Sequence, residues 1–130
     1  MFKESFVIDT DIIIDLLRDF PKSKEFFKDI ETKKYEVSFS TLTEVELFSG
    51  ESCSSLEEQA LIDNLLSLMR RIDINRDVAR KAGEVRRKYN IPIADSIIAA
   101  TAIISGSRKL MTRNLKHYKN VKGIKAKLPY

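Results

Sequence analysis

Apolar residues along the chain follow two kinds of spacing, one typical of buried strands and one typical of amphipathic helices. Short apolar or alternating runs predict strands at 6–8, 35–40, 72–74 and 109–112, with Ile124 at the start of a fifth. Apolar residues three or four positions apart predict helices at 12–17, around 26–30, at 41–48, from 54 to 69, at 77–89 and at 92–105. Strands that alternate with helices in this way indicate a largely parallel sheet covered on both faces. The predicted fold class is therefore α/β, a three-layer α/β/α sandwich whose mainly parallel sheet has four to five strands.

Capping residues set the boundaries of several of these helices. Ser54 and Glu57 have the spacing of a capping box and predict the start of the long fourth helix. The apolar face predicted for that helix consists of Leu56, Ala60, Leu61, Leu65, Leu68 and Met69. Pro92 is placed to open the last long helix, and Gly106 is placed to end it.

Length and composition indicate one globular domain over residues 1–130. The chain is 43% hydrophobic and 32% charged, as in soluble globular proteins, and its 130 residues are too few for two ordinary domains. Its one cysteine, Cys53, allows no internal disulfide and no cysteine-rich zinc site, which favours a reducing compartment. Aspartates interrupt the apolar N-terminal residues, which argues against a signal peptide, and the uncharged stretch 96–107 is too short to cross a bilayer. We therefore expect a cytoplasmic protein that does not enter a membrane.

Asp95 is the only charged residue between Ile91 and Ser107, and it follows Pro92 where an apolar helix is predicted to begin. An ionised carboxylate beside that much apolar surface is costly unless hydrogen bonds, a cation or a metal ion compensate it. One explanation is a helix cap, because aspartate stabilises the first turn of a helix. The other explanation is a metal site.

Other polar residues occupy equivalent places at the ends of predicted strands. Asp9 ends the first strand, Glu44 follows the second within a few residues, and Thr112 and Asn114 stand at the end of the fourth. In parallel α/β sheets the functional crevice lies beyond the carboxyl ends of the strands. We therefore expect these side chains and Asp95 to share one crevice, provided that the strands are neighbours.

Three carboxylates that meet in one crevice repel each other unless a cation lies between them. Oxygen ligands of this kind bind magnesium or manganese, so the predicted metal ligands are Asp9, Glu44 and Asp95, with Mg²⁺ or Mn²⁺ as the cofactor. Such an ion can activate water and stabilise the oxygens of a phosphodiester during hydrolysis. The charge distribution fits a polyanionic substrate, because no acid follows Asp95 while eight lysines and arginines do. A solvated basic surface is the alternative explanation for that run of charges.

Four segments resemble the PIN-domain ribonucleases, and in particular the VapC toxin group. They are Val-Ile-Asp-Thr-Asp-Ile-Ile-Ile-Asp-Leu-Leu (7–17), Ser-Thr-Leu-Thr-Glu-Val-Glu-Leu-Phe-Ser-Gly (40–50), Ile-Ala-Asp-Ser-Ile-Ile-Ala-Ala-Thr-Ala (93–102) and Leu-Met-Thr-Arg-Asn-Leu-Lys-His-Tyr (110–118). The segments stand in the order of the family and cover nearly the whole chain. The resemblance implies a metal-dependent endoribonuclease that cleaves RNA to 5′-phosphate and 3′-hydroxyl ends. It also implies a toxin that forms a homodimer and is silenced by an antitoxin whose tail lies across the acidic groove.

Carried over by position, the resemblance makes Asp9 and Asp95 the principal metal ligands, with Glu44 completing the acidic cluster directly or through water. Thr112 and Asn114 would line the same pocket. Many relatives have a fourth acid near the end of the last core strand, where this chain has only Thr112 and the neutral amide of Asn114. This departure puts a second tightly held ion in doubt.

Five nearby residues have competing interpretations. Asp11 can reach the site, but we expect it to cap the first helix, and we expect Asp15 to be solvent-facing or salt-bridged. Glu46 lies about 200° around a helix from Glu44, so we expect it at the surface. Arg113 is the predicted substrate contact, because a guanidinium can clamp a phosphate, with a salt bridge to a helix as the alternative. His117 is expected to be exposed or to contact phosphate rather than to act as a catalyst.

Two other functions compete with ribonuclease activity. The Asp9-Thr10-Asp11 turn also resembles the aspartyl-phosphate loop of haloacid-dehalogenase phosphatases, with Asp9 as the nucleophile, but the later acidic loop of that family is missing. The stronger alternative is a catalytically inactive PIN-like module that only binds RNA or a protein. The three acids argue against that alternative.

Overall fold

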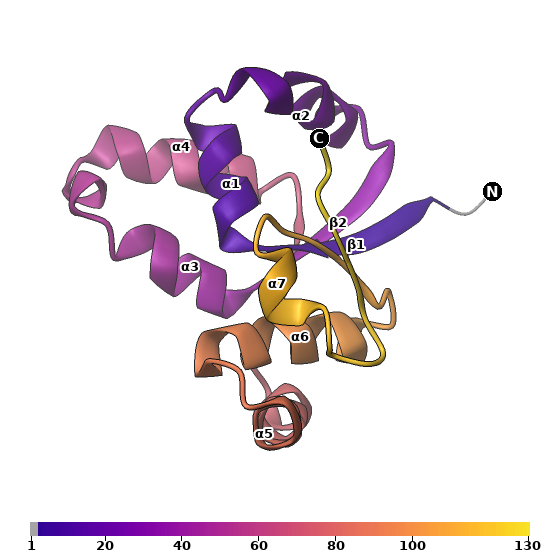
Figure 1. Cartoon of the computed structure of the whole chain (residues 1–130). Helices are drawn as coiled ribbons and strands as arrows, with labels where there is room; N and C mark the ends of the chain where they lie inside the picture. The colour runs from indigo at the N-terminus through magenta and orange to yellow at the C-terminus, as the bar shows by residue number, and fades with distance from the viewer. Residues whose placement is uncertain (1–2) are drawn as a thin grey trace.

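The computed structural model describes residues 3–130, apart from the side chain of Ser52, and has at its centre one five-stranded, fully parallel sheet (Figure 1). The strands lie in the spatial order β3-β2-β1-β4-β5. They are β1 (Glu4–Ile8), β2 (Tyr35–Ser40), β3 (Arg70–Ile72), β4 (Lys109–Met111) and β5 (Lys125–Lys127). The parallel sheet predicted from the alternation of strands and helices is confirmed.

Helices cover both faces of the sheet and complete the predicted three layers (Figure 1). They are α1 (Thr10–Leu17), α2 (Lys24–Glu31), α3 (Thr41–Phe48), α4 (Leu56–Leu66), α5 (Arg76–Tyr89), α6 (Ile93–Ser105) and α7 (Leu115–Tyr118), with short 3-10 turns η1 (Pro21–Ser23) and η2 (Glu51–Ser54). Helices α1, α2 and α4 pack on one face, and α5, α6 and α7 lie on the other. Within residues 3–130, none of these helices has the length and apolar character needed to cross a membrane.

Strand β1 explains why the apolar runs are continuous rather than alternating. Phe6 and Ile8 point into the core formed with α1, α2 and α4, whereas Val7 points into the core formed with α6. All three are at most 1% exposed, because successive side chains of a strand face opposite sides and both sides are covered here. This burial fixes the position of the residue that follows β1, which is Asp9.

The structure corrects the predicted register of α4. The N-cap is Ser55, whose side chain accepts a hydrogen bond from the Glu58 amide, because Ser54 still belongs to η2. The buried side chains of this helix are Ile62, Leu65 and Leu66. Leu56 and Leu61, predicted on the buried face, are instead 82% and 54% exposed. The third strand is also displaced from 72–74 to 70–72.

Both edge strands of the sheet carry exposed cations. Arg70 and Arg71 are exposed on β3, and Lys125 and Lys127 are exposed on β5.

The predicted boundaries of α6 are confirmed. Pro92 is its N-cap, and Gly106 ends it with a φ of 85° that glycine adopts without strain. The N-terminus of α6, which carries Asp95, is therefore set by its own sequence.

Candidate functional site

Asp9 and Thr112 meet because the strands they follow are neighbours in the sheet. Ile8 of β1 pairs with Met111 of β4, and the Asp9 amide donates to the Met111 carbonyl at 2.9 Å. The Thr112 hydroxyl donates to Oδ2 of Asp9, also at 2.9 Å, while Oδ1 of Asp9 accepts from the Thr10 amide at 2.8 Å. Asp9 is thus both the N-cap of α1 and the carboxylate at the end of the central strand.

Tyr118 connects Asp9 to Asp95. Its hydroxyl lies 3.2 Å from Oδ2 of Asp9 and 3.3 Å from Oδ1 of Asp95, and the residue is only 1% exposed. A phenol has one proton, so it donates to one of these carboxylates at a time. The expected meeting of Asp9 and Asp95 is therefore observed, and it depends on an aromatic residue that the sequence did not single out.

Burial raises the pKa of Asp9 to about 6. The negative charge of Asp11 adds to this effect, while the hydrogen bonds from Thr112, Thr10 and Tyr118 act in the opposite direction. Burial also raises the pKa of Asp11 and of Tyr118. The ionised form of Asp9 is consequently disfavoured in the protein alone, and a cation in the adjacent cavity would favour it.

A cavity of about 230 Å³ opens beside Asp9. Its lining consists of Asp9, Thr10, Asp11, Ile14, Glu46, Ala94, Asp95, Ile98 and Asn114. Four of these residues are acids, and they come from the end of β1, the first turn of α1, the middle of α3 and the first turn of α6. Asp9, Asp95 and Asn114 thus share a crevice as expected, whereas Thr112, predicted to line the same crevice, is fully buried and absent from its lining.

The acid that α3 contributes to this cavity is Glu46, and the prediction of Glu44 is wrong in this respect. The Thr10 hydroxyl contacts Thr43 Oγ1 at 3.0 Å and donates to Glu46 Oε1 at 2.8 Å. Glu46 is three residues after Thr43 and therefore lies on the same side of α3. Glu44 points about 160° away from Glu46 around the helix and is absent from the cavity lining.

Asp11 and Arg113 also differ from the expectations. Asp11 is not the cap of α1 but a half-buried acid of the cavity, and its Oδ2 accepts from the Arg113 amide at 2.8 Å. The Arg113 guanidinium instead lies 2.6 Å from the buried carboxylate of Asp15, which also accepts from the Tyr130 hydroxyl. The structure therefore supports the salt bridge for Arg113 rather than a phosphate clamp.

His117 lies at the rim of the site, with its side chain 49% exposed. Its Nδ1 is 2.7 Å from Oδ2 of Asp95, but no hydrogen bond of acceptable geometry reaches that oxygen from residues 3–130. Oδ2 of Asp95 and Oδ1 of Asp11 are the two buried side-chain oxygens without a donor in this described part of the chain. Both oxygens are closed to solvent, and the imidazole of His117 is the group that lies beside Oδ2 of Asp95.

The acids of this cavity could hold a cation only together with water. Among the described residues, no three acidic, histidine or cysteine side chains converge tightly enough to chelate one ion by themselves. Magnesium commonly keeps several waters and takes only one or two carboxylates from a protein. Asp9 and Asp95, joined through Tyr118 and facing one cavity, provide such a pair.

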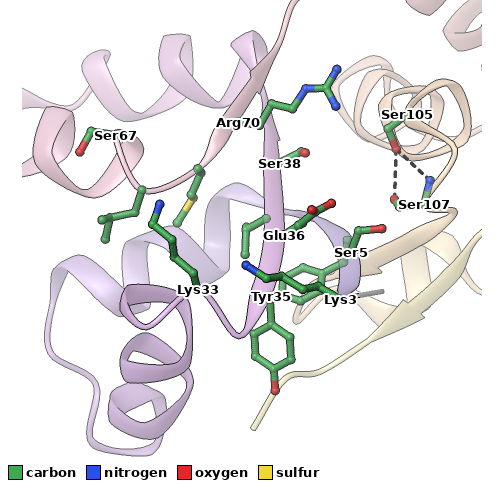
Figure 2. A pocket seen from close by; sticks show the side chains of 14 residues that line it. Lys3, Ser5, Lys33, Tyr35, Glu36, Ser38, Ser67, Arg70, Ser105 and Ser107 are labelled. Atoms are coloured by element: carbon green, nitrogen blue, oxygen red, sulfur yellow. Dashed lines mark hydrogen bonds between the residues drawn. The ribbon is translucent and has the colours of Figure 1, made fainter. Parts of the chain in front are cut away.

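A larger cavity, of about 470 Å³, lies at the opposite edge of the sheet, around the amino ends of β1, β2 and β3 (Figure 2). Figure 2 shows that serines and the cations Lys3, Lys33 and Arg70 dominate it. Glu36 is its one acidic lining residue. A cavity of this composition cannot hold a divalent cation with several carboxylates, so size is a poor guide to the functional site here.

Comparisons with known proteins find similar sequences and similar folds. Residues 6–123 match the family model described as PIN domain. Ribonuclease VapC19 of Mycobacterium tuberculosis is 31% identical over 117 residues, which cover 86% of this chain and 90% of that protein. The solved toxin-antitoxin complex from Klebsiella pneumoniae contains a chain with a TM-score of 0.78 and 27% identity, covering 96% of this chain and 98% of that one. The solved structure of VapBC2 from Rickettsia felis, bound to a promoter DNA fragment, contains a chain with a TM-score of 0.80 and 24% identity to this one. The match covers 95% of this chain and 98% of that one.

Proposed function

Because the chain belongs to the PIN-domain family, we propose that it is a metal-dependent endoribonuclease and the toxin of a VapBC-type pair. The observation that carries the proposal is the cavity that Asp9, Asp11, Glu46 and Asp95 line together at the carboxyl end of the sheet. The proposed ion is Mg²⁺ or Mn²⁺, with Asp9 and Asp95 as its principal ligands. When bound, such an ion lowers the pKa of water and stabilises charge on phosphoryl oxygens.

The residues of the chain prepare the site for hydrolysis by fixing the acids in place. Thr112, Thr10 and Tyr118 hold both oxygens of Asp9, so that this carboxylate keeps one orientation. Thr10 also holds Glu46 at the cavity mouth. Asn114 adds a neutral amide to the lining, which can contact a phosphate oxygen without repelling it.

Three apolar side chains also belong to the lining of the cavity. Ile14, Ala94 and Ile98 line it between the acids. Low-polarity groups beside the acids strengthen the electrostatic interactions between the acids and a bound cation.

The test of the proposed function is cleavage of RNA by the purified chain in magnesium or manganese and in EDTA. We expect cleavage only with the metal, and its loss in Asp9→Asn and in Asp95→Asn. The matched control is Asp19→Asn, which removes an exposed acid outside the cavity lining. RNA binding without cleavage in any of these buffers would instead support the inactive PIN-like module.

We also propose an antitoxin as the protein partner, with both molecules in the cytoplasm. Three cavities follow one another along α1: the acidic cavity shares Ile14 and Glu46 with a second, which shares Leu17 with a third of about 430 Å³. The third is a groove between α1, α2 and α4 with six apolar lining residues, Leu16, Leu17, Phe27, Leu61, Leu65 and Leu68. A groove of this kind accepts the apolar face of a helix, and a chain leaving it along α1 would reach the acids.

The partner proposal is tested by co-expression with the reading frame adjacent to the gene. Leu61→Asp places a charge in the groove at a position that is 54% exposed, so folding should be retained. We expect the variant to lose co-purification with the antitoxin while RNA cleavage is preserved. Equal co-purification of the variant and the native chain would argue against this groove.

A homodimer is the assembly we propose for the free toxin. Val45 and Ile74 are 61% and 39% exposed, and they lie on adjacent segments, since the Ile74 amide donates to Thr41 one turn before Val45. Exposed apolar side chains on neighbouring segments are typical of contact surfaces. Sedimentation at micromolar concentration tests the assembly, and a monomeric coefficient would contradict it.

A further inference from the structure

We propose that the larger cavity, at the amino end of the sheet, binds a ligand that carries several phosphate groups in a row. This cavity has a volume of about 470 Å³, a size typical of small-molecule sites, and it shares no lining residue with the acidic cavity. The proposal is therefore independent of metal binding and of RNA cleavage.

The cavity exists because β3 covers only half of β2. The pairing of the two strands runs from Ser38 to Ser40, so the first three residues of β2 have no strand on that side within residues 3–130. The segment 67–69, which leads into β3, borders the cavity instead. The cavity is thus open along the free edge of β2, where a ligand can enter from solution.

The cations of the lining are unpaired. Lys3, Lys33 and Arg70 are exposed and take part in no salt bridge within the described residues 3–130. Cations that border one cavity repel each other, and a bound polyanion relieves this repulsion. Glu36 is the only acid of the lining, so a ligand with several negative charges is favoured over a neutral one.

Two serine hydroxyls add uncharged donors. The hydroxyls of Ser67 and Ser105 donate to main-chain carbonyls three residues earlier. Ser5 and Ser38 are half-buried lining residues whose hydroxyls make no hydrogen bond within residues 3–130. A serine hydroxyl can donate to a phosphate oxygen, so these two side chains are the donors that remain for a ligand.

These groups lie on two sides of β2. Glu36 and Ser38 are two residues apart, so they point to the same face of the sheet, and Ser5 and Arg70 are their partners in the neighbouring strands. Figure 2 shows Lys33 on the opposite side of β2 from Glu36. A row of phosphates that crosses the free edge of β2 would therefore meet a lysine on one side and hydroxyls with an arginine on the other.

The fold does not require the side chain of Lys33. This residue follows α2 with a φ of 60°, a left-handed conformation that glycine adopts more readily than lysine. Lys33→Gly consequently removes the cation and relieves the backbone at the same time. A loss of binding in this variant cannot be attributed to a loss of folding.

The experiment is a calorimetric titration of tripolyphosphate into the protein in EDTA, with urea unfolding as the check on stability. We expect the affinity of Lys33→Gly to fall by about 3-fold or more at unchanged or higher stability. Ser38→Ala should also weaken binding, by about 3-fold, although it changes no charge. Glu36→Gln should strengthen binding, because it removes the one negative charge of the lining.

The matched control is Lys24→Gln, which removes an exposed lysine at the start of α2, outside the cavity lining. It should retain the native affinity. An equal loss in Lys24→Gln and Lys33→Gly would overturn the proposal, because it would indicate nonspecific attraction. Native affinity in both Lys33→Gly and Ser38→Ala, or no binding by the native chain, would overturn it as well.

A second titration, with a short single-stranded RNA in EDTA, distinguishes the sources of the phosphate groups. If Lys33→Gly weakens the binding of both ligands, the backbone of RNA is an occupant of the cavity. If it weakens the binding of tripolyphosphate alone, the ligand is a free polyphosphate or nucleotide. Neither titration involves cleavage, so their failure would leave the proposed ribonuclease activity untouched.

Discussion

The hydroxyl of Thr10 donates a 2.8 Å hydrogen bond to the carboxylate of Glu46. This contact joins the first turn of α1 to the middle of α3 and places Glu46 at the mouth of the acidic cavity. Glu44 lies on a different side of the same helix. The two glutamates therefore form a pair of variants on different sides of one helix, with Glu44 half-buried and Glu46 exposed.

We expect Glu46→Gln to lower RNA cleavage by at least about 10-fold, because it removes a negative charge from the cavity. Glu44→Gln should cleave at close to the native rate. The measurement is the initial rate at saturating magnesium with both variants at equal concentration. A lower cleavage rate for Glu44→Gln than for Glu46→Gln would indicate that Glu44 is the glutamate of the site.

Asp9→Asn should stabilise the metal-free protein near neutral pH. Burial raises the pKa of Asp9 from 3.8 to about 6, so the folded state favours the protonated acid. The protonated Asp9 side chain contributes to the free energy of unfolding, and this contribution is fully present below about pH 4 and is lost as the pH rises through about 6. At pH 7 the native chain must keep a buried charge, which costs about 3 kcal/mol at most, and asparagine avoids that cost.

The measurement is urea unfolding in EDTA near pH 4 and near pH 7. We expect the stability gain of Asp9→Asn over the native chain to appear only at the higher pH. Added Mn²⁺ should reverse the order, because only the native carboxylate binds the ion. A gain that is the same at both pH values would show that the ionisation of Asp9 is not its cause.

Tyr118→Phe should destabilise the metal-free protein by about 1–3 kcal/mol, because it removes the one proton that the phenol donates to either Asp9 or Asp95. The control is Tyr89→Phe, which removes a hydroxyl that accepts from the exposed Lys122 amide. Chemical unfolding at neutral pH measures both changes. Equal effects of the two substitutions would mean that the bridge between Asp9 and Asp95 contributes little.

Cleavage should weaken as salt is added, because cations near the site release counterions when RNA binds. Lys116 and Lys119 are exposed on α7 and directly after it, next to Asn114 and Tyr118. We expect Lys116→Gln with Lys119→Gln to raise KM at low salt and to flatten its salt dependence. The charge-matched control replaces Lys24 and Lys28 of α2, and an equal effect there would indicate nonspecific attraction.

Much of the fold follows from local patterns. The strand Tyr35–Ser40 and the helix Thr41–Phe48 have the boundaries that their apolar spacing and the cap at Ser40 dictate. The meeting of Asp9 with Thr112 was also predictable in kind, because the carboxyl ends of parallel strands lie on one edge of a sheet. The neighbourhood of β1 and β4 had to be seen in the structure.

Two of the errors concern which side of a helix is buried. Leu61 has the spacing of a buried residue, yet it is exposed because Ile62, Leu65 and Leu66 are the side chains that meet the sheet. Glu46 reaches the site because the Thr10 hydroxyl contacts Thr43, which lies on the same side of α3 as Glu46. Thr10 and Thr43 are 33 positions apart in the sequence. Tyr118 resembles an ordinary core aromatic, and only its hydroxyl partners reveal its place in the site.

The cations on β3 and β5 affect how copies of this molecule can associate. The outermost strands leave backbone groups free to extend the sheet into a neighbouring molecule. With Arg70 and Arg71 along one margin and Lys125 and Lys127 along the other, any such joining would bring like charges together. The like charges therefore oppose the joining of sheets from many molecules edge to edge. Association through the helical surfaces, which gives complexes of defined size, is favoured instead.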